Sequence, residues 1–188
     1  DTWKVYASYN TSLRMPSVTE LFYSVGGHKA DPNLKPEELS AVEVGVKYNK
    51  KGLSGTVSSF YNHHTNLIEK DAAGAILWKS VNFGTINALG FETTLNADFR
   101  QLLPSQKLLK SFSVGYCFIQ QHQIEAAGIH SLYALEYLKN KVTSSLQLNL
   151  WKALDLNVNY RFQHRMGTYK DPSGALHRYG SYGLLDAR

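Results

Sequence analysis

Strict alternation of apolar and polar residues most limits what this 188-residue chain can fold into. Val42, Val44, Val46 and Tyr48 alternate with polar or small neighbours, which is the period of a β-strand with one apolar and one polar face. The same pattern recurs in other segments, at about 3–9, 53–62, 91–99, 112–118, 142–150, 154–162 and 182–188. We therefore predict about eight amphipathic strands and no long helix.

The connections between these segments alternate in length. The long ones run at about 15–38, 65–86, 121–139 and 166–180. Between them lie short ones at about 49–52 and 152–153 and one of medium length at about 100–109. In an antiparallel sheet this places the long loops at one end and the short turns at the other, which is typical of an outer-membrane β-barrel. We predict an all-β fold, an antiparallel up-and-down transmembrane β-barrel fragment of about eight strands. Residues 1–188 would form one partial barrel domain of a longer protein.

Composition excludes several classes of protein. The mean hydropathy of −0.30 and the lack of a long apolar run argue against a membrane helix. The net charge of +5 comes from scattered side chains, so we expect no nucleic-acid partner. The single cysteine, Cys117, permits no internal disulfide. Catalytic and metal-binding motifs are not found, so we expect no enzyme, no resident cofactor and no metal site.

The first long connection is rich in proline. Pro16, Pro32 and Pro36 each fix φ and remove a backbone donor, so neither a helix nor a ladder strand can pass through them. We predict that this loop is irregular. Arg14 could form a buried ion pair with Glu20 or with Glu37 and so tie the loop down, and the spacing does not choose between the two.

The residues around this loop also carry a family resemblance. Residues 13–22 read Leu-Arg-Met-Pro-Ser-Val-Thr-Glu-Leu-Phe, and residues 31–40 read Asp-Pro-Asn-Leu-Lys-Pro-Glu-Glu-Leu-Ser. These two stretches resemble the paired loop motifs of TonB-dependent outer-membrane receptors, and residues 81–92 resemble a strand of the same family. The layout, particularly at 160–167 and 184–188, resembles that of cobalamin receptors. The matching loop-motif residues are Arg14, Pro16, Glu20, Asp31, Pro32, Asn33, Leu34, Pro36 and Glu37.

The resemblance implies a transporter of about 22 strands with a plugged lumen, located in the outer membrane of a Gram-negative bacterium. Its partners would be outer-membrane lipid, a plug domain, the remaining barrel strands and a small-molecule metal chelate. The TonB energy-transducing complex would act through the plug. Cobalamin, a ferric siderophore and haem all stay open as ligands. The isolated fragment would have two open edges, so we expect it to oligomerise.

Several loop residues could contact such a ligand. His28 lies between the two loop motifs, where haem receptors of this family are known for a histidine, and an imidazole can ligate iron. Tyr23 and Tyr133 could offer apolar contact together with a hydroxyl group. His63 and His64 follow the third predicted strand as neighbours and would point to opposite faces if the chain stays extended there, so only one of them could face the lumen. The plainer alternative is that all five are structural or solvated residues.

Two other hypotheses fit the alternating pattern. One is a complete, self-closing eight-stranded outer-membrane barrel that acts as an adhesin or structural protein, and it requires the first and last strands to pair. The other is a soluble β-sandwich binding module, and it requires the apolar faces to form a shared core. Strand pairing and burial therefore discriminate among the three.

Overall fold

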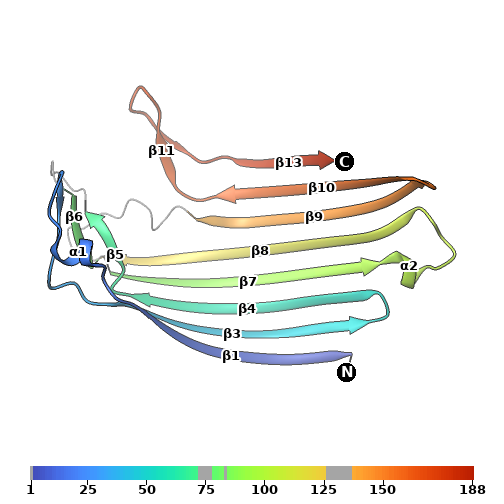
Figure 1. The fold of residues 1–188 in the computed structure, drawn as a ribbon, viewed down its shortest axis with the longest axis horizontal. Helices are drawn as coiled ribbons and strands as arrows, with labels where there is room; N and C mark the ends of the chain where they lie inside the picture. The colour runs from blue at the N-terminus through green and yellow to red at the C-terminus, as the bar shows by residue number, and fades with distance from the viewer. Residues whose placement is uncertain (1, 72–77, 83, 126–136) are drawn as a thin grey trace.

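The computed structural model describes residues 2–71, 78–82, 84–125 and 137–188. They form one antiparallel sheet of eight strands whose order in the sheet follows their order in the chain (Figure 1). The strands are β1 (Trp3–Arg14), β3 (Glu37–Lys50), β4 (Leu53–Thr65), β7 (Gly84–Asp98), β8 (Leu109–Glu125), β9 (Leu138–Trp151), β10 (Leu154–Arg165) and β13 (Ser181–Ala187). The predicted all-β, up-and-down fold of about eight strands is confirmed.

Long and short connections fall on opposite ends of this sheet, as predicted (Figure 1). The short end carries tight turns and the helix α2 (Phe99–Leu102). The long end carries the small elements α1 (Val18–Phe22), β2 (His28–Lys29), β5 (Ile68–Asp71), β6 (Trp78–Asn82), β11 (Thr168–Lys170) and β12 (Leu176–Arg178). No helix in the described part of the chain is long and apolar enough to cross a membrane.

The prediction that the first loop is irregular is wrong in part. Helix α1 starts just after Pro16, with Ser17 as its N-cap, and the short strand β2 follows before Pro32. A proline stops an element from passing through it but does not prevent a short element between two prolines. Ser17 and Glu20 form a capping box, in which their side chains accept hydrogen bonds from two backbone N–H groups that would otherwise be free at the start of the helix.

Strand boundaries at the long end also differ from the predicted ones. Strand β7 begins at Gly84 and β8 continues to Glu125, so the predicted loops at 65–86 and 121–139 are too long. Both strands extend past the point where apolar residues stop alternating with polar ones. The alternation of apolar and polar residues therefore covers a shorter part of these strands than the backbone hydrogen bonds do.

At the short end, Phe99 is the predicted last residue of a strand but instead begins α2. The side chain of Asp98 accepts a hydrogen bond from the backbone N–H of Arg100 at 3.0 Å and caps this helical turn. Asp residues at an N-cap favour helix initiation because they satisfy a free backbone donor. This local capping interaction ends the strand one residue earlier than the alternation suggests.

The apolar face of the sheet is exposed in this structure. Among the described residues, only three hydrophobic side chains are buried, namely Leu34, Ala88 and Ala97. Each of the eight long strands carries large apolar side chains that are between 37% and 76% exposed, including Val5, Tyr9, Val42, Val44, Val57, Tyr61, Leu89, Phe91, Leu95, Ile124, Leu150, Leu154, Tyr160 and Leu185. A sandwich would bury these side chains in a shared core. The β-sandwich hypothesis is therefore wrong.

The sheet is open at both edges. Over the described residues, β1 pairs with β3 alone and β13 pairs with β10 alone. A closed eight-stranded barrel would need a ladder between β1 and β13, and the structure has none within the residues it describes. The hypothesis of a self-closing barrel is therefore contradicted.

Polar side chains mark where the apolar face ends toward the long loops. Ser40, His63 and Asn87 are cross-strand neighbours on β3, β4 and β7, and each lies two residues beyond the last large apolar side chain of its strand. Asn140 and His164 form the equivalent pair on β9 and β10. The apolar face therefore forms a band that ends at the same height on these neighbouring strands, where polar side chains begin.

On the opposite, polar face, aromatic rings cover glycines on neighbouring strands. Phe60 is directly opposite Gly90, and a Cβ atom at Gly90 would overlap the Phe60 ring. Tyr6 covers Gly45 in the same way and donates a hydrogen bond to Glu43 Oε1 at 2.6 Å. These rings lie against the sheet and leave the space above it open.

We predict that Gly90→Ala destabilises the folded protein by about 1–3 kcal/mol, because the added methyl group forces the Phe60 ring out of its position. The free energy of unfolding in detergent micelles measures this effect. Gly180→Ala is the control, because nothing lies within 4 Å of a Cβ at that position. Combining Gly90→Ala with Phe60→Leu should recover part of the loss. Equal stability of Gly90→Ala and Gly180→Ala would contradict the prediction.

Candidate functional site

Two loops that are far apart in the sequence form one unit at the long end of the sheet. Strand β2 pairs in parallel with β6, and β6 pairs with β5, so a three-stranded sheet joins the first long loop to the second (Figure 1). We call this unit the loop platform and define it as residues 15–36, 66–71 and 78–82. It contains most of the predicted site residues.

An ion-pair cluster connects the loop platform to the strands. Arg14, the last residue of β1, is directly opposite Glu37, the first residue of β3. Its Nη2 donates to Glu37 Oε1 at 2.7 Å, and its Nη1 lies 3.2 Å from Glu20 Oε2. Arg14 therefore pairs with both predicted partners. The Arg14 side chain is 46% exposed, so the cluster is half-buried instead of buried.

Glu37 is the centre of this cluster. Its Oε1 also accepts the backbone N–H of Ile68 at 2.8 Å, which fixes the start of β5 in the second loop. His64 Nε2 lies 3.7 Å from Oε2 on the other side. Glu37 is buried, and a buried carboxylate is stable only when donors surround it. This one side chain thus joins β1, β4 and both loops of the platform.

Helix α1 is held by Glu20. Its Oε2 accepts the Ser17 backbone N–H at 2.7 Å, and the Ser17 hydroxyl accepts the Glu20 N–H at 3.2 Å. Partial burial opposes ionisation of Glu20, but the hydrogen bonds from Ser17 and Arg14 outweigh it and lower the pKa of Glu20 below its usual value. The Glu20 carboxylate is therefore charged at neutral pH and can bind Arg14.

The second loop motif forms a tight turn against α1. The Asp31 N–H donates to the Glu20 carbonyl oxygen at 2.9 Å, and Asp31 Oδ1 accepts the Asn33 N–H at 2.9 Å. Lys79 Nζ of β6 lies 3.5 Å from Asp31 Oδ2. The backbone hydrogen bond from Asn33, with Lys79 nearby, lowers the pKa of Asp31. Leu34 in this turn is buried.

The sequence did not indicate that Asn82 fastens the two loops together. Its side-chain oxygen accepts the Lys35 N–H at 2.8 Å, and its Nδ2 donates to the carbonyl oxygens of Lys35 at 3.0 Å and Asn66 at 2.7 Å. Lys35 lies two residues before the start of β3 at Glu37. The only signal was the resemblance of 81–92 to a family strand, which includes an asparagine.

The imidazole of His28 is fully engaged within the protein. Its Nε2 lies 2.9 Å from the Ser80 hydroxyl, and its Nδ1 lies 3.0 Å from the carbonyl oxygen of Tyr23 at the end of α1. Ser80 is 2% exposed, and nothing in the sequence pointed to it. Ligation of iron by His28 would require one of these contacts to break, and this role stays a prediction. The Tyr23 side chain is exposed.

His63 and His64 lie next to each other on β4 and point to opposite faces. That only one of them faces the lumen stays a prediction. His64 meets Glu37 at the polar face, whereas His63 Nδ1 lies 2.7 Å from Asn87 Oδ1, which also accepts the Tyr61 hydroxyl at 3.0 Å. Tyr133 is outside the described residues. Among those that are described, no three His, Cys, Asp or Glu side chains are placed to hold a metal ion.

A hairpin of β11 and β12 organises the last long loop. Asp171 accepts hydrogen bonds from the Ser173 hydroxyl at 2.6 Å, from the backbone N–H groups of Ser173 and Ala175, and contacts His177 Nε2 at 2.9 Å. Hydrogen bonds from Ser173 and then His177 lower the pKa of Asp171 to about 2. The alternation of residues predicts only a long loop here, although Asp-Pro-Ser-Gly at 171–174 is a typical turn sequence.

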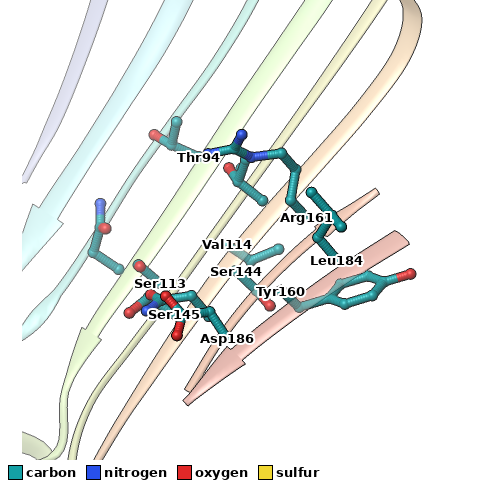
Figure 2. Close-up of a pocket in the computed structure, with 13 residues that line it drawn as sticks. Thr94, Ser113, Val114, Ser144, Ser145, Tyr160, Arg161, Leu184 and Asp186 are labelled. Atoms are coloured by element: carbon teal, nitrogen blue, oxygen red, sulfur yellow. The ribbon is translucent and has the colours of Figure 1, made fainter. Parts of the chain in front are cut away.

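On the polar face, a hollow of about 660 Å³ is lined by residues of the long strands and by none of the loop platform (Figure 2). Its polar lining includes Thr94, Ser113, Ser145, Arg161 and Asp186, which come from β7, β8, β9, β10 and β13. This face suits water or a polar protein surface, whereas the other suits lipid. One curved wall with two such faces is what a membrane barrel with a filled lumen requires.

The family assignment agrees with this geometry. The model of the family described as TonB dependent receptor-like, β-barrel, matches residues 1–188. The chain belongs to this family. Its members are outer-membrane receptors and transporters, and the resemblance inferred from the loop motifs is therefore confirmed.

Solved structures share the fold at low sequence identity. The FrpB iron transporter from Neisseria meningitidis is 18% identical with a TM-score of 0.68, over 100% of this chain and 30% of its own. The siderophore receptor PirA from Pseudomonas aeruginosa is 16% identical with a TM-score of 0.65, over 97% and 29%. A mutant of the ferric enterobactin receptor PfeA from the same organism is 17% identical with a TM-score of 0.71, over 98% and 30%. This chain therefore spans less than a third of each relative.

We predict that Glu37→Ala releases the second loop, because the Ile68 N–H loses its acceptor and Arg14 keeps only Glu20. A buried donor without a partner costs about 1–3 kcal/mol, so amide exchange at Ile68 should accelerate about tenfold or more. Hydrogen exchange resolved to single amide groups measures this rate. Glu38→Ala is the matched control, because Glu38 is exposed on the adjacent position. Unchanged exchange at Ile68 in Glu37→Ala would refute the role of Glu37.

The hairpin of β11 and β12 should respond to acid. Because the pKa of Asp171 is lower in the folded loop than in an unfolded chain, its contribution is complete above about pH 4 and is lost as the pH falls toward 2. The amide resonances of Ser173 and Ala175 should shift over this range. Asp171→Asn should abolish the shift. If the variant shows the same titration, another group is responsible.

Proposed function

We propose that this chain is the ligand-capturing wall of an outer-membrane receptor that imports a scarce metal chelate in a TonB-dependent manner. The observation that carries the proposal is the loop platform, in which two long loops are joined by Glu37, Asn82 and a shared small sheet at one end of an amphipathic β-wall. A rigid platform above a polar lumen is suited to hold a ligand at the entrance of a barrel.

The two faces and edges of the sheet support the proposed partners. Outer-membrane lipid of a Gram-negative cell would cover the apolar face, and a plug domain would fill the lumen against the polar face. Further barrel strands would pair with the open edges of β1 and β13, which in isolation would pair with other copies of the fragment. The TonB complex would act on the plug.

Exposed apolar side chains on the loop platform support contact with a bulky ligand. Met15, Phe22, Tyr23 and Val25 are between 58% and 70% exposed, although α1 and the first loop are otherwise held by polar contacts. Exposed apolar groups that cluster on an ordered loop commonly mark a binding surface. Tyr23 adds a hydroxyl group that can bind a polar edge of the chelate.

The names of the structural relatives suggest the class of ligand. They include an iron transporter, a siderophore receptor, a ferric enterobactin receptor and a copper transporter. We infer that a ferric siderophore is the first ligand to test, with cobalamin and haem as alternatives. Haem would require His28 to release Ser80 or Tyr23, whereas a siderophore would require no such change.

Binding to the full-length receptor tests the proposal. Ferric siderophores, cobalamin, haem and copper ions are titrated separately, and one of them should bind at micromolar concentration or below. Removal of the aromatic contacts by Phe22→Ala and Tyr23→Ala should weaken it about 5- to 30-fold each. Leu154→Ala is the control, because Leu154 is equally exposed but lies at the short-turn end. Failure of all four ligands to bind would refute the proposal.

His28→Ala separates two roles of the histidine. A loss that is confined to haem would identify His28 as an iron ligand. An equal loss for every ligand that binds would identify His28 as a support of β2 and β6, as its contacts with Ser80 and Tyr23 suggest. Unchanged haem binding would end the ligand hypothesis for this residue.

A further inference from the structure

A second hollow, of about 410 Å³, lies on the apolar face near the short-turn end of the sheet. It takes no part in ligand capture, since the long loops are at the opposite end. Its apolar lining comes from β1, β3, β4 and β7, namely Trp3, Val46, Tyr48, Gly55, Val57 and Leu95. A depression of this size in a lipid-facing wall has room for part of a hydrocarbon chain.

The hollow exists because a glycine lies between larger side chains. Gly55 is the cross-strand neighbour of Tyr48 on one side and of Leu95 on the other. The rings of Trp3 and Tyr48 pack with their centroids 4.6 Å apart and form one wall, and Leu95 lies across from them. A Cβ atom at Gly55 would approach the Thr94 carbonyl oxygen to 2.9 Å, so the floor admits no side chain without movement.

Two lysines follow Tyr48, which lines the hollow, in the direction of the short turn. Lys50 follows Tyr48 at the next position on the same face of β3, and Lys51 is the first residue of the adjoining turn. Both are exposed, and neither forms an ion pair within the described part of the chain. The N–H of Asp98 donates to the carbonyl oxygen of Gly52, which follows Lys51 in this turn. The Asp98 carboxylate pairs with Arg100, whose Nη2 lies 2.9 Å from Oδ2. The local charge is therefore positive.

We propose that this hollow is a binding site for an anionic glycerophospholipid of the periplasmic leaflet. One acyl chain would lie between the Trp3–Tyr48 pair and Leu95, and the phosphate would contact Lys50 and Lys51. Short turns of outer-membrane barrels face the periplasm, and lysines at a membrane surface attract anionic head groups. The inference rests on the membrane-spanning role proposed above.

The charge and the shape point to one occupant. A zwitterionic lipid could fill the hollow equally well but would gain less from the two lysines, and a soluble protein would not reach a depression within the lipid-facing band. Tryptophan and tyrosine are also enriched at the level of the head groups, which is where Trp3 and Tyr48 lie if Lys50 marks the membrane surface. An anionic phospholipid fits the two lysines, the apolar hollow and the two aromatic rings.

Native mass spectrometry of the full-length receptor tests the charge requirement. The protein is released from micelles that contain equal amounts of phosphatidylglycerol, phosphatidylethanolamine and phosphatidylcholine with the same acyl chains. Phosphatidylglycerol should be retained preferentially, and Lys50→Gln with Lys51→Gln should reduce its retention about fivefold or more. Lys152→Gln is the matched control at the turn between β9 and β10 and should change retention less than twofold.

A second pair of variants tests the shape. Val57→Trp fills the hollow and should reduce retained phosphatidylglycerol, whereas Leu150→Trp places the same ring on the apolar face of β9, away from the hollow, and should not. Equal retention of the three lipids would overturn the proposal. So would equal effects of the Lys50/Lys51 and Lys152 variants, or no effect of Val57→Trp.

These experiments distinguish a failure of the lipid site from a failure of the proposed uptake function. If the receptor binds its metal chelate but retains no phosphatidylglycerol selectively, the lipid site is refuted and the uptake role stands. If it retains phosphatidylglycerol through Lys50 and Lys51 but binds no chelate, the uptake role fails and the lipid site stands.

Discussion

Exposure of one apolar face to hydrocarbon is the constraint on which the rest of the structure depends. Within lipid, every backbone donor and acceptor needs a partner in the protein, and only a continuous ladder of strands provides one over the whole band. On β10 the apolar positions Leu154–Phe162 span roughly 27 Å along the strand, which at a tilt of about 40° covers roughly 20 Å of the height of the lipid-facing band. Irregular backbone is therefore confined to the two ends of the sheet, where the long loops and the short turns lie.

The loop platform shows how polar contacts replace the apolar core that such a sheet does not have. Glu37 joins two strands to both loops, Asn82 binds the backbone of both loops, and His28 links α1 to β6 through Tyr23 and Ser80. These groups are partly shielded from water, so each contact is worth more than it would be on an open surface. Displacement of one loop must therefore move the other.

Strand number, the alternation of faces and the ends at which loops lie were predictable because each follows from local periodicity. The exact ends of β7 and β8 were not, because hydrogen-bonded pairing continues past the apolar band, where hydrophobicity no longer reports it. Local capping by Ser17 and Asp98 also produced α1 and α2, which alternation cannot reveal. The Arg14 cluster was foreseen only as two alternatives, since sequence spacing does not measure distance between loops.

The sequence by itself determined that the chain forms amphipathic antiparallel strands, because a period of two residues has only one structural solution over so many segments. Its loop motifs also determined the family. Only the tertiary structure decided that the sheet stays open, that Arg14 binds both Glu20 and Glu37, and that Ser80 and Asn82 hold the platform. These contacts join residues up to 52 positions apart, and such distances are set by how the strands register in space and by nothing local to either partner.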